Sequence, residues 1–176
     1  LPASMNQVEY FGRGPAENYL DRNAGSMIGL YKSTAEELYF SYVRPQENGH
    51  HTDTRWVSLS AGKKGLLIQA DNTIGFNALR NSIEDFDDEE ATGLPRQWSN
   101  FTPEQVANHD EAAAKSVLRR QRNINDITPR DFVEACVDLK QQGVAGYDSW
   151  GSRPEPAYTL PANREYNWGF TLIPLK

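Results

Sequence analysis

A stretch near the end of the chain reads Tyr166-Asn167-Trp168-Gly169-Phe170-Thr171-Leu172-Ile173. Its large side chains recur at every second position, so they share one face of an extended strand. A helix would instead repeat its apolar positions every three or four residues. The stretch therefore favours a β fold, and the same pattern recurs through the rest of the chain.

Shorter stretches of this kind are separated by residues that favour turns. The sequence predicts further strands over residues 7–11, 26–32, 37–43, 55–60, 66–70, 74–79 and 132–139. Such regularly spaced strands indicate a mainly β protein, an antiparallel β-sandwich in one domain over residues 1–176. One segment differs, because Thr102-Pro103-Glu104-Gln105 combines an N-cap, a first-turn Pro and a capping-box Gln after an acidic run. It predicts one inserted helix near residues 102–120.

Composition limits the classes of partner. The 176 residues suffice for one domain with a substantial core. A net charge of −6 with no basic cluster argues against nucleic acid or an anionic membrane as partner. No apolar run approaches the roughly 20 residues that span a bilayer. The single Cys136 excludes an internal disulfide, leaves the compartment open, and is interpreted as a small core residue.

A glycine-rich loop is the main candidate for function, and it reads Gln142-Gly143-Val144-Ala145-Gly146-Tyr147-Asp148-Ser149-Trp150-Gly151. Its three glycines indicate tightly turning backbone, and Asp148 and Ser149 can bond their own backbone. Such a turn can hold the Trp150 indole still with one face free, as a sugar-binding platform requires. By residue type alone a Trp in a β protein is more often a core residue, so both interpretations stay open.

Three segments, in this order, resemble a known family. They are VEYFGRGPAENYLDR (residues 8–22), YVRPQENG (residues 42–49) with Thr54-Arg55-Trp56 after it, and the loop ending in Asp148-Ser149-Trp150-Gly151. They resemble the C-terminal domain of the large β-galactosidases of glycoside hydrolase family 2, which the small subunit of two-chain β-galactosidases also carries. The resemblance covers nearly the whole chain apart from roughly residues 88–120.

This resemblance implies a supersandwich, galactose mutarotase-like domain, present here in part. It implies that the parent enzyme hydrolyses terminal β-D-galactosyl bonds with retention, in a separate (β/α)₈ barrel. The family places a Trp of this domain at the edge of the sugar pocket, and by motif that residue is Trp150, with Asp148 as a second candidate for substrate binding. The family loop has two glycines before its acidic residue, whereas Ala145-Gly146-Tyr147 precedes Asp148 here, and this departure bears on the loop's path.

The chain by itself is not expected to be catalytic. A retaining glycosidase needs two carboxylates about 5–5.5 Å apart. Glu17, Glu47 and Asp148 stand in motifs, but carboxylates in such loops accept backbone N–H bonds. The family's acid/base and nucleophile both lie in the barrel, so no catalytic residue is assigned. Its Mg and Na sites lie mostly in other domains, so no cofactor or metal ligand is assigned either.

Other clusters carry weaker signals. His50, His51 and Asp53 could bind a metal, but adjacent histidines point apart and match no zinc spacing, so solvated loop residues are the preferred interpretation. Arg22 and Arg55 are expected to form bidentate pairs that pin loops.

The expected partners are the catalytic barrel and the other domains of a parent β-galactosidase, with a galactoside as substrate. The compartment, cytoplasmic or periplasmic, would follow the parent. Two alternatives remain, a stand-alone carbohydrate-binding module and a purely structural or oligomerisation domain in which Trp150 is core. Because the family's domain is larger, early strands are expected to be missing, and the uncovered strand edges should let the isolated chain self-associate.

Overall fold

The computed structural model describes residues 1–43, 46–86, 127–148 and 151–176. The chain divides into two compact units, of which the first comprises Leu1–Phe40, Asn48–Arg80 and Arg130–Lys176. The second comprises Ser41–Glu47 and Asn81–Pro129. In its described part, the Asp85 carboxylate accepts the backbone N–H of Ser82 at 3.0 Å and caps the short 3₁₀ helix η1 (Ile83–Phe86). The helix predicted over residues 102–120 lies outside the described residues.

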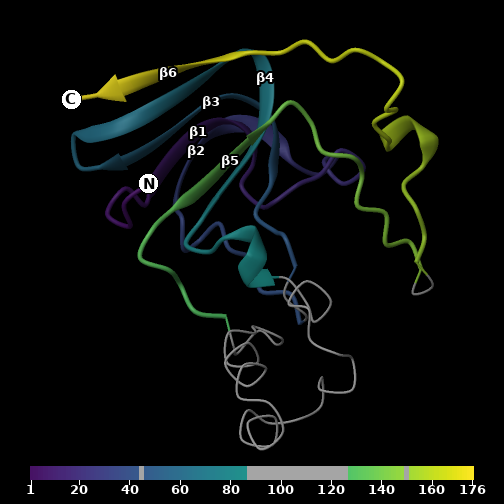
Figure 1. Ribbon diagram of the computed structural model, residues 1–176, viewed down its shortest axis with the longest axis horizontal. Helices are drawn as coiled ribbons and strands as arrows, with labels where there is room; N and C mark the ends of the chain where they lie inside the picture. Colours follow the sequence, from purple (N-terminus) through teal and green to yellow (C-terminus); the bar gives the residue numbers. More distant parts are fainter. Residues whose placement is uncertain (44–45, 87–126, 149–150) are drawn as a thin grey trace, which may run out of the picture. The chain divides into compact units, whose positions relative to one another are not determined.

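The first unit is built on one antiparallel sheet, which confirms the prediction of a mainly β fold (Figure 1). Its strands are β1 (Gln7–Gly14), β2 (Met27–Thr34), β3 (His51–Ala61), β4 (Lys64–Leu79), β5 (Glu134–Asp138) and β6 (Phe170–Leu175). Their order is β2-β1-β3-β4-β5, and β6 also pairs with β4. No helix in the described part of the chain is long and apolar enough to cross a membrane.

Strand β4 shares one edge between two partners. Its first half, Gly65 to Ala70, pairs with β6, and its second half, Gly75 to Leu79, pairs with β5. Between the two partners, the Asp71 N–H donates to the carbonyl of Gly169 at 3.0 Å. The other edge of β4 pairs with β3, so this strand connects the whole sheet (Figure 1).

A two-residue hairpin joins β3 to β4. Ala61 pairs with Lys64, so Gly62 and Lys63 form the turn, and Gly62 has a φ of +64°. A positive φ at the first turn position is what type II′ hairpins require, and glycine adopts it without steric strain. This turn falls between the strands predicted over residues 55–60 and 66–70.

The core lies on one face of the sheet. Tyr10 of β1 and Phe76 of β4 are each 1% exposed, with ring centroids 5.1 Å apart in an edge-to-face arrangement. They are surrounded by further side chains of the same face, namely Val8, Val57, Leu59, Ile68 and Ile74. Burying an aliphatic or aromatic side chain of this size contributes about 1.5–3 kcal/mol.

Several predicted strands differ from the observed ones, and β3, for example, begins at His51 rather than at residue 55. Residues 37–43 form no strand, although they carry apolar and aromatic residues. The strands predicted over 66–70 and 74–79 are one continuous strand, because Asp71 and Asn72 stay extended as exposed positions of β4. β1 continues through Gly12 to Gly14, beyond its predicted end at residue 11. The last strand begins at Phe170 rather than Tyr166, because its pairing with β4 starts there.

Candidate functional site

The glycine-rich loop is held by Asp21, which lies more than a hundred residues earlier in the chain. Its Oδ1 accepts the N–H of Val144 at 3.0 Å, and its Oδ2 accepts the N–H of Ala145 at 2.8 Å. The Tyr147 hydroxyl also lies 3.4 Å from Oδ2. Bonds from backbone N–H groups to a carboxylate are about twice as strong as neutral ones. Asp21 therefore contacts three residues of this loop, Val144, Ala145 and Tyr147.

The backbone of this loop is unusual at two successive residues. Ala145 and Gly146 have φ angles of +54° and +78°, in the left-handed region. A residue with a Cβ rarely adopts this region and is strained there by about 1–2 kcal/mol. Two further bonds hold the loop, from Gly143 N–H to the Tyr158 carbonyl at 2.7 Å and from Tyr147 N–H to Ser152 Oγ at 3.1 Å.

Asp21 is itself placed by a tight turn. Tyr19 and Arg22 form a small antiparallel bridge, with bonds of 3.4 Å and 2.8 Å between their backbones. Leu20 and Asp21 are the two residues at its tip. The carboxylate is thus presented by backbone that is anchored on both sides.

Asn18 joins the first motif to residues 50–52, which lie between the two parts of the second motif. Its side chain is fully buried, and its Oδ1 accepts both the N–H and the hydroxyl of Thr52, at 2.9 and 2.6 Å. Its Nδ2 donates to the carbonyls of Arg13 and Ala16, each at 3.1 Å. Every donor and acceptor of the amide is used. The backbone N–H of Asn18 also donates to the His50 carbonyl at 2.7 Å.

Glu17 links the first motif to the end of the second. Its Oε2 accepts the Gly49 N–H at 2.7 Å and the Tyr19 hydroxyl at 3.2 Å. The prediction that this carboxylate accepts a backbone N–H is confirmed. Within the first unit, Glu17 and Asp21 of the first motif therefore contact Gly49, the last residue of the second segment, and the glycine-rich loop.

His50 and His51 are not solvated loop residues, and that prediction is wrong. Each is 1% exposed, because the chain turns into β3 here and the two rings enter packed surroundings. The His50 ring stacks on Tyr19 with centroids 5.7 Å apart, while the His51 ring stacks on Phe76 at 5.2 Å. Burial lowers the pKa of both imidazoles, and lowers the pKa of His50 to about 4.

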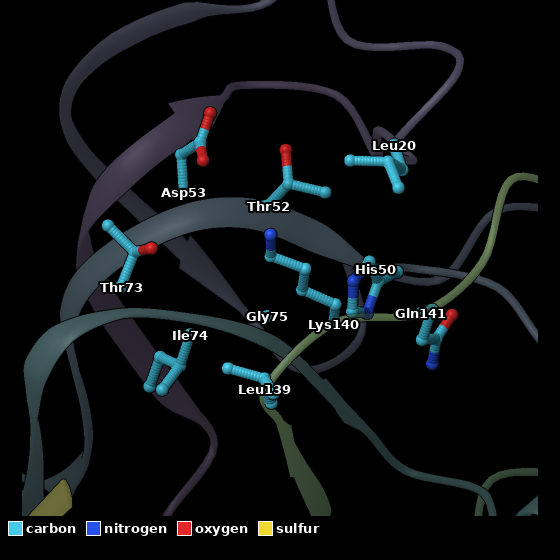
Figure 2. Close-up of a pocket in the computed structure, with 10 residues that line it drawn as sticks. All are labelled: Leu20, His50, Thr52, Asp53, Thr73, Ile74, Gly75, Leu139, Lys140 and Gln141. Atoms are coloured by element: carbon cyan, nitrogen blue, oxygen red, sulfur yellow. The ribbon is translucent and has the colours of Figure 1, made fainter. Parts of the chain in front are cut away.

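A small pocket opens beside His50 (Figure 2). It is lined by Leu20, His50, Thr52, Asp53, Thr73, Ile74, Gly75, Leu139, Lys140 and Gln141. Figure 2 shows His50 next to Lys140 and Gln141, which follow β5. Its volume of about 40 Å³ holds a few water molecules and is too small for a sugar ring.

The remaining residues singled out from the sequence lie in different parts of the chain. Trp150 lies outside the described residues, so its role stays a prediction. Asp148 is exposed at the end of the loop that Asp21 holds. Glu47 belongs to the second unit. Cys136 is half-buried in β5, where its N–H donates to the Asn77 side chain at 3.3 Å.

The bidentate ion pairs predicted for Arg22 and Arg55 are not observed among the described residues. Arg13 forms the ion pair that holds a loop, with its Nε 2.5 Å from Asp53 Oδ2. Arg55 instead donates to the backbone carbonyl of Asp53 and lies over the Phe11 ring, and Arg22 is exposed. Among the described residues, no group of three or more His, Cys, Asp or Glu side chains is arranged to hold a metal ion.

Sequence reasoning missed the importance of Asp21 and Asn18. Both look like ordinary turn residues, and their partners lie 123 and 34 residues away. The one signal in the sequence was Gly143, because a glycine can mark a position where another group packs closely against the backbone. A Cβ on Gly143 would lie 2.6 Å from the Asp21 carboxyl carbon.

Comparison with known proteins finds similarity to β-galactosidases over nearly the whole chain. A family model described as the β-galactosidase small chain matches residues 1–172. A β-galactosidase of Priestia megaterium is 33% identical over 99% of this chain, and one of Staphylococcus xylosus is 27% identical over 98%. An Arthrobacter β-galactosidase is 38% identical over 48% of the chain. The chain spans only 14% of the length of the first two relatives.

Proposed function

The chain belongs to the β-galactosidase small-chain family, and from this premise we propose that it is the C-terminal domain of an enzyme that hydrolyses terminal β-D-galactosyl residues. The observation that carries the proposal is the family match over residues 1–172. The contacts among the three motifs support it, since they fix a loop whose sequence ends in Asp148-Ser149-Trp150-Gly151.

Trp150, with Asp148 beside it, is proposed to contact the bound galactoside at the edge of the active site. The flat indole would cover the apolar C–H face of the sugar, while the hydroxyls are bonded elsewhere. Aromatic stacking of this kind contributes about 1–3 kcal/mol per ring. The catalytic carboxylates, and the Mg and Na ions of the family, are proposed to lie in other domains of the parent. These domains would cover this chain and complete a supersandwich of the galactose mutarotase type.

The test is Trp150→Ala in the complete β-galactosidase that contains this chain. We expect KM to rise roughly ten- to hundredfold with the fold intact. Trp168→Ala is the matched control, because Trp168 is 45% exposed and lies outside the loop. Unchanged kinetics with a lower melting temperature for Trp150→Ala would contradict the proposal and assign Trp150 to the core.

A second experiment separates this proposal from a stand-alone carbohydrate-binding module. The purified chain should neither hydrolyse a chromogenic β-galactoside nor bind galactose in a titration, because both need the barrel. Galactose binding by the chain alone would favour the binding module. Turnover that disappears on mutating Glu17, Glu47 or Asp148 would contradict the absence of a catalytic pair.

A further inference from the structure

We propose that Asp21 is a positioning residue of the sugar site, and that its carboxylate sets the path of the loop from Gly143 to Asp148. The inference rests on the proposed function, because it takes this loop as the one that meets the galactoside. It adds a residue that lies outside the loop and contacts it only through hydrogen bonds.

The geometry requires a carboxylate at this position. Two successive backbone N–H groups, of Val144 and Ala145, each donate to a different oxygen of Asp21. An asparagine offers one acceptor oxygen, so its amide NH₂ would face one of these N–H donors. A glutamate is one methylene longer and would need more room. Gly143 packs tightly against the Asp21 side chain, since a Cβ added to Gly143 would lie only 2.6 Å from the Asp21 carboxyl carbon.

The bonds to Asp21 add to those of Gly143 with Tyr158 and of Tyr147 with Ser152, which hold the two ends of this stretch. Val144 and Tyr147 are 43% and 57% exposed, so their burial contributes little. Ala145 is held in the left-handed region, a conformation that persists only when surrounding contacts enforce it. The bond to Asp21 falls on the N–H of this residue. Loss of the carboxylate should therefore let the backbone relax to an ordinary conformation and change the direction of the chain after Gly146.

Tyr147 is oriented by the same carboxylate. Its hydroxyl donates to Asp21 Oδ2, while more than half of the side chain stays exposed. The pKa of this hydroxyl is raised, by desolvation first and then by the negative charge of Asp21. Asp21 thus fixes one exposed ring of the loop as well as its backbone.

If Asp21 had a purely structural role, its removal would lower stability rather than substrate binding. Asp21 sits at the tip of a turn and is half-buried, whereas the core of the sheet is formed by Tyr10, Phe76 and their neighbours. Removing the carboxylate should leave this core unchanged. A positioning role therefore predicts a loss of substrate binding that exceeds any loss of stability.

The experiment compares Asp21→Ala, Asp21→Asn and Tyr147→Phe in the complete β-galactosidase. We expect kcat/KM to fall roughly ten- to hundredfold for Asp21→Ala, mainly through KM, since small misplacements of a binding group have effects of this size. Asp21→Asn should lose less because one acceptor remains, and Tyr147→Phe least. Asp71→Asn, an exposed carboxylate of β4 outside the loop, is the matched control and should leave the kinetics unchanged.

A double-mutant cycle with Trp150→Ala completes the test. If Asp21 acts through the loop, Asp21→Ala should reduce kcat/KM by no more than about twofold once Trp150 is already removed. Equal losses in both backgrounds, or a fall in melting temperature with unchanged KM, would overturn the inference. If Trp150→Ala alone raises KM and Asp21→Ala does not, only the positioning role fails. If neither variant changes KM, the proposed role of the loop fails as well.

Discussion

The two halves of β4 belong to one strand and share one neighbour, β3, yet they differ in environment. All six residues from Ile74 to Leu79 are buried. In the first half, from Lys64 to Thr73, only Ile68 is buried. Phe76 packs against Tyr10 and His51 on one face, and the His50 ring lies over Gly75 on the other. The covered half is thus packed between Tyr10 of the first motif and the two histidines at the start of β3.

The open half carries apolar residues that nothing in the described chain encloses. Phe170, Leu172 and Ile173 of β6 are 38%, 53% and 36% exposed. A groove of about 520 Å³ runs beside them and is lined mostly by apolar side chains, among them Leu66, Ile68, Phe132, Val137, Phe170 and Leu172. Exposed apolar surface of this kind marks interaction sites. The difference teaches that one half of β4 is buried by this chain's own residues, whereas the other half leaves apolar surface exposed.

The largest expected effect contrasts Phe76→Ala with Leu67→Ala on the same strand. Phe76→Ala should lower the free energy of unfolding by about 3–5 kcal/mol, because it empties a packed core site. Leu67 is only half-buried, so Leu67→Ala should lower it by about 1 kcal/mol. Urea denaturation of the purified chain measures both. Similar losses for the two variants would mean that the open half is covered after all.

A pH titration of stability examines the covered half through His50. Burial lowers the pKa of this group from about 6.5 to about 4. Between these values the unfolded chain binds a proton that the folded chain does not, so stability falls as the pH drops from about 6.5 and the loss is complete near pH 4. A shift of this size corresponds to about 3 kcal/mol. His51 acts in the same direction, because burial lowers its pKa too.

Unfolding curves at pH 7, 5.5 and 4.5 measure this dependence, and His50→Gln is the control. The variant removes one titrating group, so its stability should vary less over this range than that of the natural chain. An identical slope would show that His50 is not enclosed as described.

The fold class could be predicted from the sequence because alternation is a local signal that each strand carries by itself. The environment of β4 could not, since it is set by partners distant in the chain. Asp71 and Asn72 suggested a break because both favour turns, but both lie within β4, where the Asp71 N–H donates to the Gly169 carbonyl of a segment almost a hundred residues later. Residues 37–43 have the side chains of a strand, but the neighbours of β1 are already β2 and β3.

The candidate site shows the same limit. The loop at residues 142–151 could be recognised in the sequence as a glycine-rich motif. The Asp21 carboxylate that bonds to it could not be recognised, because it lies more than a hundred residues earlier. Two adjacent histidines in a polar segment suggested solvent exposure, and their burial depends on Tyr19, Tyr10 and Phe76. Side-chain chemistry is local information, whereas burial and pairing are produced by the folded chain as a whole.

A smaller effect is expected for Gly75→Ala, which tests how closely His50 covers β4. An added Cβ would lie 2.4 Å from the His50 ring, so the ring or the strand must shift. We expect a loss of about 1–3 kcal/mol, as for other overpacked sites. Gly25→Ala is the matched control, because nothing lies within 4 Å of a Cβ there. Equal behaviour of the two variants in urea denaturation would contradict the close packing of His50.

The smallest effect on stability, and the most direct test of the open half, comes from Leu172→Lys. Leu172 is 53% exposed, so the free energy of unfolding should change by no more than about 0.5 kcal/mol. We expect the isolated chain to self-associate at micromolar concentration, and light scattering should show a lower mass for this variant. Thr171→Lys places the same charge on the same strand without removing apolar surface. If the groove drives association, only Leu172→Lys reduces it, whereas pairing between strand edges would be weakened by both charges. A natural chain that stays monomeric on concentration would mean that the open half needs no cover, and that its exposed leucine and phenylalanine side chains are tolerated in water as they stand.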